Sequence, residues 1–295
     1  MASGRMARVE CEGVSVFLLL VLAALHHTVK AEEKMLDMAP DAVDDDFSDC
    51  RDKMLKVVQD DLLQKELAAE EQFKEIWSKN SKICRKMISG GTPLHTDALQ
   101  AYGNSKTTFR KKFNDLVYSK GNNNMTYREK FNFKSLHFLL TDSLRLLKPE
   151  NCRTVYYGTS NIYTAVPGTQ VRFGKFIKPT FKKSSATEFL EDEGSLFIIN
   201  SCSVVNVEEN TCKSEEIEGL ISPAEVFTVQ KVEGSEYREI TLNHSRFLSN
   251  HHCSFFHRNA ADVESSSSLT LILLALLACL WTQLTETAGL TCSFL

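Results

Sequence analysis

The sequence lacks the motifs of several large protein classes. It holds no Cys-x-x-Cys pair, which argues against a structural zinc site. It has no Gly-rich loop of the P-loop or Rossmann kind, so neither phosphate-binding motif is supported. No Ser–His–Asp set, metal-ligand cluster or internal repeat stands out in the sequence. The formal net charge of −4 is small and favours neither a nucleic acid nor an acidic partner.

The sequence also has no apolar run of the roughly 20 residues that a membrane-spanning helix needs. Residues 14–25 are apolar, follow Arg5 and Arg8, and precede the small residue Ala31. This order is typical of a secretory signal peptide, so we expect residues 1–31 to be removed. A signal anchor is the alternative, and the shortness of the run argues against it.

The carboxyl end has the order of a GPI-attachment signal. Small residues from Asn259 onward precede a polar spacer at 262–268 and an apolar run at 269–281. We expect the lipid anchor on Asn259 or a nearby small residue, and residues 259–295 to be the propeptide. A transmembrane helix is the alternative, but the run is short and no Lys or Arg follows it. The tail after the run is not uniformly apolar, which counts against GPI attachment. Residues 32–258 then form one domain of ordinary size.

The cysteines of this domain are typical of a secreted protein. Of nine cysteines, Cys11, Cys279 and Cys292 lie in the two end segments, which leaves an even number in the domain. The six that remain are Cys50, Cys84, Cys152, Cys202, Cys212 and Cys253. An even number favours disulfides over metal ligation, and six cysteines allow fifteen connectivities. Two sequons predict N-glycosylation of Asn124 and Asn243.

The pattern of apolar residues changes in the middle of the chain. Apolar residues recur at helical spacing in the first half and alternate or cluster in short runs in the second. We expect helices at 51–80, 94–102, 108–118, 133–147 and 184–190. We expect strands at 154–157, 170–177, 195–200, 220–221, 225–232 and 237–242. The sequence therefore predicts an α+β domain that is mainly helical over 32–149 and mainly β over 150–258.

Several other residues have expected places in this scheme. The acidic segment 44–49 is expected to be an extended lead-in, and 121–124 a loop. His137 lies in an apolar helical pattern and is expected to pack inside the fold. Phe173 and Phe176 are expected in the core. His244, His251 and His252 lie near the end of the domain and are expected to be exposed.

Five segments occur in an order that resembles one family. They read MLDMAPDAVDDDFSDC from Met35, FNFKSLHFLLTDSLRLL from Phe131, VYYG from Val155, VRFGKF from Val171 and EIEGLISPAEVF from Glu216. Together they resemble the vertebrate ecto-ADP-ribosyltransferases over about residues 35–255. The resemblance implies transfer of one ADP-ribose from NAD+, or NADP+, to arginine side chains of cell-surface or extracellular proteins. It also implies release of nicotinamide without a metal, and disulfide pairs Cys50–Cys253 and Cys152–Cys202. Cys84 and Cys212 are left over in the common family pattern, and we expect them to pair.

The family's catalytic signature has three parts, of which the E-x-E is present. The resemblance implies that Glu218 stabilises the ribosyl cation-like transition state and holds a ribose hydroxyl. It implies that Glu216 orients the acceptor guanidinium and accepts its proton. On a strand, residues two apart face the same side, so one face would serve both donor and acceptor.

The other two parts of the signature are altered. Tyr157 stands where the family has an arginine that contacts NAD+, and Gly158 follows it as in the family. Lys178 replaces the first serine of F-x-S-x-S, and Thr180 keeps a hydroxyl at the second. We take these four as candidate cofactor-binding residues. The loop from Cys202 to the E-x-E is acidic and lacks the family's aromatic residue. The hypotheses are therefore a weak arginine-specific transferase and a catalytically inactive surface binding protein.

Overall fold

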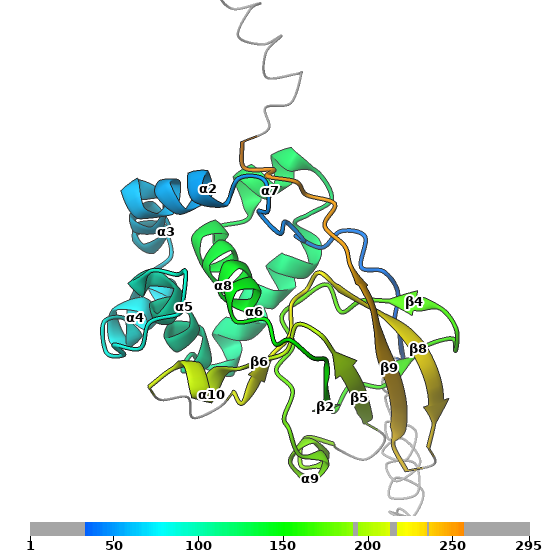
Figure 1. Cartoon of the computed structure of the whole chain (residues 1–295). Helices are drawn as coiled ribbons and strands as arrows, with labels where there is room; N and C mark the ends of the chain where they lie inside the picture. The colour runs from blue at the N-terminus through cyan, green and yellow to red at the C-terminus, as the bar shows by residue number, and fades with distance from the viewer. Residues whose placement is uncertain (1–32, 191–193, 213–216, 235, 257–295) are drawn as a thin grey trace, which may run out of the picture.

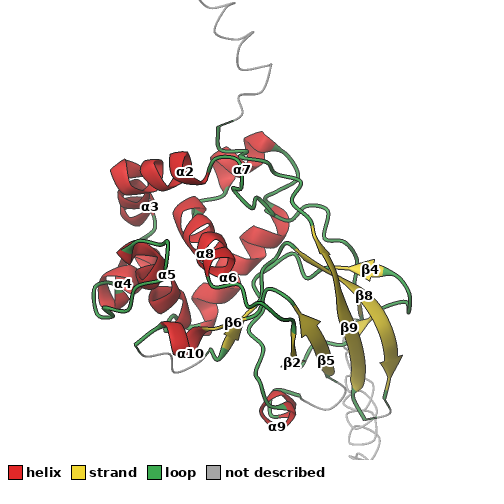
Figure 2. Cartoon of the chain, viewed as in Figure 1, coloured by secondary structure: helices red, strands yellow, loops and turns green. Residues whose placement is uncertain are grey.

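The molecule has a helical half and a β half that lie side by side (Figure 1). The computed structural model describes residues 33–190, 194–212, 217–234 and 236–256. Colouring by secondary structure separates the two halves clearly (Figure 2). This arrangement confirms the predicted α+β fold. The expected signal peptide and GPI propeptide lie outside the described residues. Within them, no helix is both long and apolar enough to cross a membrane.

The helical half contains the helices predicted between residues 51 and 147. Its elements are α2 (Arg51–Val57), a π-helical turn η1 (Val58–Leu62), α3 (Leu63–Ala69), α4 (Glu71–Asn80), α5 (Pro93–Gly103), α6 (Thr107–Ser119), α7 (Asn124–Lys130) and α8 (Lys134–Leu146). Helix α7 was not expected, because 121–124 reads as a loop. The Asn123 side chain caps α7 by accepting a hydrogen bond from the Thr126 amide at 2.8 Å. The Tyr127 side chain then buries the short helix against the core.

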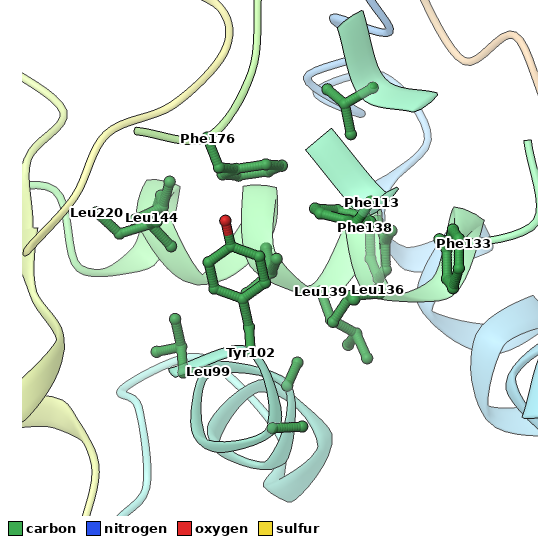
Figure 3. Packing of buried hydrophobic residues seen from close by; sticks show 14 of the residues in the cluster. Leu99, Tyr102, Phe113, Phe133, Leu136, Phe138, Leu139, Leu144, Phe176 and Leu220 are labelled. Carbon is green, nitrogen blue, oxygen red and sulfur yellow. The ribbon is translucent and has the colours of Figure 1, made fainter. Parts of the chain in front are cut away.

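Aromatic rings fill the core of the helical half (Figure 3). Phe133 packs against Phe73 and Phe109 with ring centroids 5.5 and 5.6 Å apart. Figure 3 shows the Tyr102 ring in the middle of the cluster, between Leu99 and Phe176. As predicted, His137 is fully buried, and its Nε2 lies 3.1 Å from the Val43 carbonyl oxygen.

The β half is built on a mixed five-stranded sheet. Its strand order is β2-β5-β9-β8-β4, and every neighbouring pair is antiparallel except the parallel pair β5–β9. The strands are β2 (Arg153–Thr159), β4 (Gln170–Val171), β5 (Ser195–Ser201), β8 (Glu225–Glu233) and β9 (Arg238–Phe247). Two small pairs, β1 (Lys34–Met35) with β3 (Tyr163–Thr164) and β6 (Val205–Asn206) with β7 (Gly219–Leu220), flank it. Two short helices, α9 (Lys183–Thr187) and α10 (Val207–Asn210), complete the β half.

The strand predicted at 170–177 ends early, at Val171. Gly174 turns the chain with φ of +61°, and a Cβ there would lie 2.4 Å from the Cβ of Ala39. The turn carries Phe173 and Phe176 into the core, as predicted. Asn114 then joins the two halves, because it accepts a hydrogen bond from the Phe176 amide and donates one to its carbonyl, each at 3.0 Å.

The acidic lead-in lies outside any helix or strand, and the side chains of Asp44 and Asp45 form a buried anchor, which the sequence did not indicate. Asp44 Oδ2 lies 2.5 Å from Arg172 Nη1, and both side chains are 0% exposed. Asp44 Oδ1 accepts hydrogen bonds from the His251 amide at 3.1 Å and lies 2.7 Å from its Nδ1. The prediction that His251 is exposed is therefore wrong, because its amide and ring hydrogen-bond with the buried Asp44 carboxylate. His244 is half-buried beside Glu225, so the prediction that it is exposed is also wrong. His252 is exposed, as predicted.

The disulfides hold the two halves and the chain ends together. The structure contains Cys50–Cys253, Cys84–Cys212 and Cys152–Cys202, as the resemblance implies. Beside the first of them, the Asp45 carboxylate accepts hydrogen bonds from the amides of Cys253 at 3.0 Å and Ser254 at 2.9 Å. In Figure 1 the segments before α2 and after β9 accordingly run along the same side of the molecule.

Replacing Asp44 tests the buried anchor. Asp44→Asn leaves the Arg172 guanidinium buried without a counter-charge, and we expect a loss of about 3–5 kcal/mol in the free energy of unfolding. Urea denaturation of the purified protein measures it. The matched control is Asp60→Asn, which removes an exposed helical pair with Lys56 and should cost no more than about 0.5 kcal/mol. Equal losses in the two variants would contradict a central role for Asp44.

A second prediction concerns acid stability. Burial alone would raise the pKa of Asp142, but hydrogen bonds from His95, Arg51 and Arg145 outweigh it and lower that pKa to about 2. A folded pKa below the unfolded value of 3.8 contributes stability above pH ~4 that is lost as the pH falls toward 2. The contribution is about 2 kcal/mol. We expect Asp142→Asn to lower stability at pH 6 and to flatten its decline between pH 4 and 2, measured by urea denaturation. An unchanged acid slope would contradict the assignment.

Candidate active site

A cleft of about 760 Å³ gathers the predicted site residues. Tyr157, Gly158, Lys178, Thr180 and Glu218 all line it, although they come from separate segments of the chain. These five residues therefore lie together around one cleft, and their role as a site stays a prediction. Glu216 lies outside the described residues, so its position relative to Glu218 stays a prediction.

Main-chain hydrogen bonds fix the frame of the cleft. The Thr180 amide donates to the Tyr156 carbonyl at 2.8 Å, and the Tyr156 amide returns a bond of 2.9 Å. The Gly219 amide donates to the Pro179 carbonyl at 3.1 Å. Segment 177–180 is thus held between β2 on one side and β7 on the other, whatever side chains it carries.

Glu218 is a half-buried carboxylate in a fixed orientation. It lies directly before β7, and its Oε2 accepts a hydrogen bond from the Phe181 amide at 3.0 Å. Among the described residues, no donor reaches Oε1. One oxygen is therefore held by the main chain, and the other is available to a ligand hydroxyl or to developing positive charge.

Tyr157 packs into the aromatic core of the sheet. Its ring stacks on Phe197 with centroids 5.8 Å apart and meets Phe173 edge-on at 6.1 Å. Burial raises the pKa of Tyr157 to about 12, so the hydroxyl stays neutral. The position that holds an arginine in the family pattern therefore offers an aromatic surface and no positive charge.

Lys178 is the lysine that lines the cleft among the described residues. Its ammonium lies 5.8 Å from the centroid of the Phe189 ring, within reach of a cation–π contact. Lys183 is instead paired with Glu239 at 2.7 Å. The Thr180 hydroxyl donates a hydrogen bond to the Lys182 carbonyl at 2.8 Å. Its oxygen can therefore accept a hydrogen bond from a ligand but has no further hydrogen to donate.

Helix α9 supplies part of the cleft that sequence reasoning missed. Ser185, Glu188 and Phe189 line the cleft, and Phe189 is 54% exposed. Gly158 allows this, because a Cβ there would lie 1.9 Å from the Ala186 carbonyl oxygen of α9. The sequence predicted a short helix here, but no local pattern shows that it packs on β2.

The loop before the E-x-E is described as far as Cys212 and is tied to the helical half. Besides the Cys84–Cys212 disulfide, the Lys86 ammonium donates to the carbonyls of Thr211 at 2.7 Å and Glu209 at 3.0 Å. With the loop held by these bonds, Glu208 of α10 lines the cleft. Among the described lining residues, Glu188, Glu208 and Glu218 supply three carboxylates and Lys178 supplies one ammonium. Such a lining suits a cationic group better than a pyrophosphate.

A cluster of potential metal ligands lies elsewhere. Cys202, Glu225 and His244 have ligand atoms within 4.8 Å of one another. Cys202 is in a disulfide, and Glu225 accepts hydrogen bonds from the hydroxyls of Ser201 and Ser203 at 2.6 and 2.5 Å. The cluster is therefore a satisfied structural network and does not fit a metal site.

Comparison with known proteins decides the family. The family profile described as NAD:arginine ADP-ribosyltransferase matches residues 36–249. The chain belongs to this family. T-cell ecto-ADP-ribosyltransferase 1 from Mus musculus is 34% identical over 266 residues, which cover 85% of this chain and 90% of that protein. GPI-linked NAD(P)(+)--arginine ADP-ribosyltransferase 1 from Mus musculus is 30% identical over 217 residues, covering 68% and 66%.

A solved structure also resembles the ADP-ribosyltransferase fold of this chain. It is a crystal structure of a mutant of the eukaryotic mono-ADP-ribosyltransferase ART2.2 in complex with NADH. The two share 33% identity with a TM-score of 0.64, over 75% of this chain and 98% of that one. In that relative the fold accommodates a nicotinamide dinucleotide.

Replacing Gly158 tests the packing of α9 on β2. Gly158→Ala forces its Cβ against the Ala186 carbonyl, and we expect a loss of about 1–3 kcal/mol in the free energy of unfolding. Thermal and urea denaturation measure it. The matched control is Gly168→Ala. A Cβ added there would have no atom within 4 Å, so its loss of stability comes only from the positive φ of +85°. A smaller loss at Gly158 than at Gly168 would contradict the close approach.

Proposed function

We propose that the protein transfers a single ADP-ribose from NAD+ to arginine side chains of proteins and releases nicotinamide. The observation that carries this proposal is the Glu218 carboxylate, held in the cleft by the Phe181 amide at Oε2, with no donor from the described residues at Oε1. Family membership supports ADP-ribose transfer in general. The acidic lining supports a guanidinium acceptor, which carries a positive charge.

The proposed reaction exchanges one bond to the ribose anomeric carbon for another. The bond from that carbon to the nicotinamide nitrogen breaks, and its electron pair leaves with nicotinamide. Glu218 stabilises the positive charge that develops on the ribose and accepts a hydrogen bond from a ribose hydroxyl. An arginine nitrogen then forms the new bond, and Glu216 takes its proton.

The donor would lie along the part of the cleft formed by Tyr157, Gly158, Lys178 and Thr180. Lys178 supplies a positive charge for a phosphate, and Thr180 supplies a hydroxyl oxygen that can accept from a ribose. The absence of a Cβ at Gly158 leaves room for α9. NADP+ is a possible second donor, as the name of the GPI-linked relative includes it. None of these steps requires a metal ion.

The replaced signature residues predict a slow reaction. The arginine and serine of the family pattern would each contribute about 2–4 kcal/mol to stabilising the transition state. Loss of both, without compensation, slows turnover by several orders of magnitude. The alternative function is therefore a catalytically inactive binding protein of the cell surface. The packing of Tyr157 against Phe197 favours this alternative, because the position that contacts NAD+ in the family pattern is here packed against aromatic rings of the core.

We place the protein on the outer face of the plasma membrane. The signal-peptide pattern at 1–31 and the GPI pattern beginning at Asn259 support this location, and relatives are named ecto and GPI-linked. Asn243 is exposed on β9 and Asn124 is partly exposed at the start of α7, which suits glycosylation at both. Its protein acceptors would then be extracellular or on cell surfaces.

Transfer of labelled ADP-ribose from NAD+ to an arginine analogue tests the function. We expect slow labelling by the purified protein and a further fall of about 100-fold to 1,000-fold in Glu218→Gln, which removes the stabilising charge. The matched control, Glu129→Gln on the exposed surface of α7, should label at the parent rate.

Two results would contradict parts of this proposal. Labelling that survives in Glu218→Gln would show that Glu218 is not the catalytic carboxylate. The absence of labelling, together with no rise in melting temperature at millimolar NAD+, would favour the inactive binding protein.

A further inference from the structure

The loop between α4 and α5 exposes two large apolar side chains. We refer to residues 82–88 of this connection as the 82–88 loop. Ile83 is 60% exposed and Met87 is 59% exposed. Single apolar side chains in water are ordinary on protein surfaces, so their exposure alone assigns no role. The way in which the loop is held, and its position in the fold, supply the further evidence.

The exposed side chains of the 82–88 loop alternate with buried ones. Cys84 directly follows Ile83, Ile88 directly follows Met87, and both of these following residues are buried. Cys84 forms the disulfide with Cys212. The two exposed apolar side chains are therefore next to fixed points of the chain, and their exposure does not come from a loose loop.

Side chains of α5 fix the main chain of the 82–88 loop. The Asp97 carboxylate accepts a hydrogen bond from the Lys82 amide at 2.7 Å, and the Thr96 hydroxyl donates to the Lys86 carbonyl at 2.8 Å. Lys82 has a φ of +63°, which is uncommon for a residue with a side chain and persists only where the surroundings impose it. The loop is thus preorganised, and binding through it would lose little conformational entropy.

The 82–88 loop is joined to the wall of the proposed active site. The Lys86 ammonium bonds to the carbonyls of Glu209 and Thr211 at 3.0 and 2.7 Å. Glu208, the neighbour of Glu209 in α10, lines the cleft. In Figure 1, α10 accordingly lies beside α5, the helix that follows the loop. A protein that inserts a side chain into the cleft past α10 therefore comes close to this loop.

The charges of the 82–88 loop are opposite to those of the cleft. Arg85 lies between Ile83 and Met87 in the sequence, is exposed, and forms no ion pair among the described residues. Lys82 is also exposed. The described lining of the cleft is instead mainly acidic. A partner that is complementary to both surfaces needs a cationic group at the cleft and an anionic group beside apolar side chains at the loop.

We propose that the 82–88 loop is a docking surface for the protein acceptor. This inference rests on the proposed function, because it assigns the cleft to the target arginine. Ile83 and Met87 contact an apolar side chain of the acceptor, and Arg85 pairs with one of its carboxylates. The preferred acceptor therefore carries an apolar residue and an acidic residue on the same surface as its target arginine.

Peptides with a single arginine test this substrate class. In the docking peptides, leucine and aspartate stand about three to five residues before or after the arginine, a reach of roughly 10–16 Å in an extended chain. The plain peptide has serine at both positions. Transfer of labelled ADP-ribose gives KM and kcat for each peptide, and fluorescence anisotropy gives the affinity without turnover. We expect the better docking peptide to have a KM about tenfold below that of the plain peptide, with a similar kcat.

Variants of the exposed side chains assign the contacts. Ile83→Ser combined with Met87→Ser should raise KM for the docking peptide about tenfold and leave the plain peptide and the arginine analogue agmatine unchanged. Arg85→Glu should weaken binding of the docking peptide about tenfold, and a peptide with lysine in place of aspartate should restore it. The matched controls Val166→Ser and Lys130→Glu change exposed side chains elsewhere and should have no effect.

The outcomes separate this inference from the proposed function. Labelling of agmatine with equal KM for docking and plain peptides would overturn the docking surface and leave the proposed function intact. If nothing is labelled, the proposed function fails and anisotropy decides about the loop. Equal affinities of docking and plain peptides would then overturn the docking surface, and tighter binding of the docking peptide that Arg85→Glu removes would support it.

A second copy of the chain is the other candidate occupant of the 82–88 loop. Light scattering of the purified protein and of the Ile83→Ser, Met87→Ser double variant tests it. We expect the same molar mass for both proteins. A parent dimer that becomes a monomer in the double variant would assign the loop to self-association and overturn the inference.

Discussion

The buried ion pair between Asp44 and Arg172 is the constraint on which the arrangement of the chain depends. Burial would raise the pKa of Asp44, but hydrogen bonds from His251 and Arg172 outweigh it and lower that pKa. The carboxylate therefore stays charged, and a buried charge is tolerated only with its partners in place. The segment before α2, the residue after β4 and the segment after β9 must consequently meet at one point.

The frame of the proposed active site depends on the main chain more than on the signature side chains. Segment 177–180 is bonded to β2 and β7 through its amides and carbonyls, and the Phe181 amide orients Glu218. A change of side chain at Lys178 leaves these bonds intact. The chain can therefore keep the family's fold and the orientation of the proposed catalytic carboxylate while two of the three signature parts have changed.

The change at Tyr157 is coupled to the core in a way that the change at Lys178 is not. The Tyr157 ring is packed against Phe197 and Phe173, so an arginine there would have to leave this contact or bury its charge. Lys178 reaches into the cleft over an exposed ring, and its replacement disturbs less. The structure thus gives a physical reason why the cofactor arginine is not restored by one substitution without cost to the core.

The sequence by itself determined the elements whose signal is local or is carried by family motifs. Helical spacing placed the long helices, Phe173 and Phe176 were correctly expected in the core, and the resemblance supplied the disulfide pairs and Glu218. It missed α7, which depends on a cap from Asn123, and it predicted an exposed His251, which the structure buries against Asp44. Those two residues meet across about 200 positions of the chain through hydrogen bonds that leave no local pattern. For the same reason, only the tertiary structure brought Glu188 and Glu208 to the cleft.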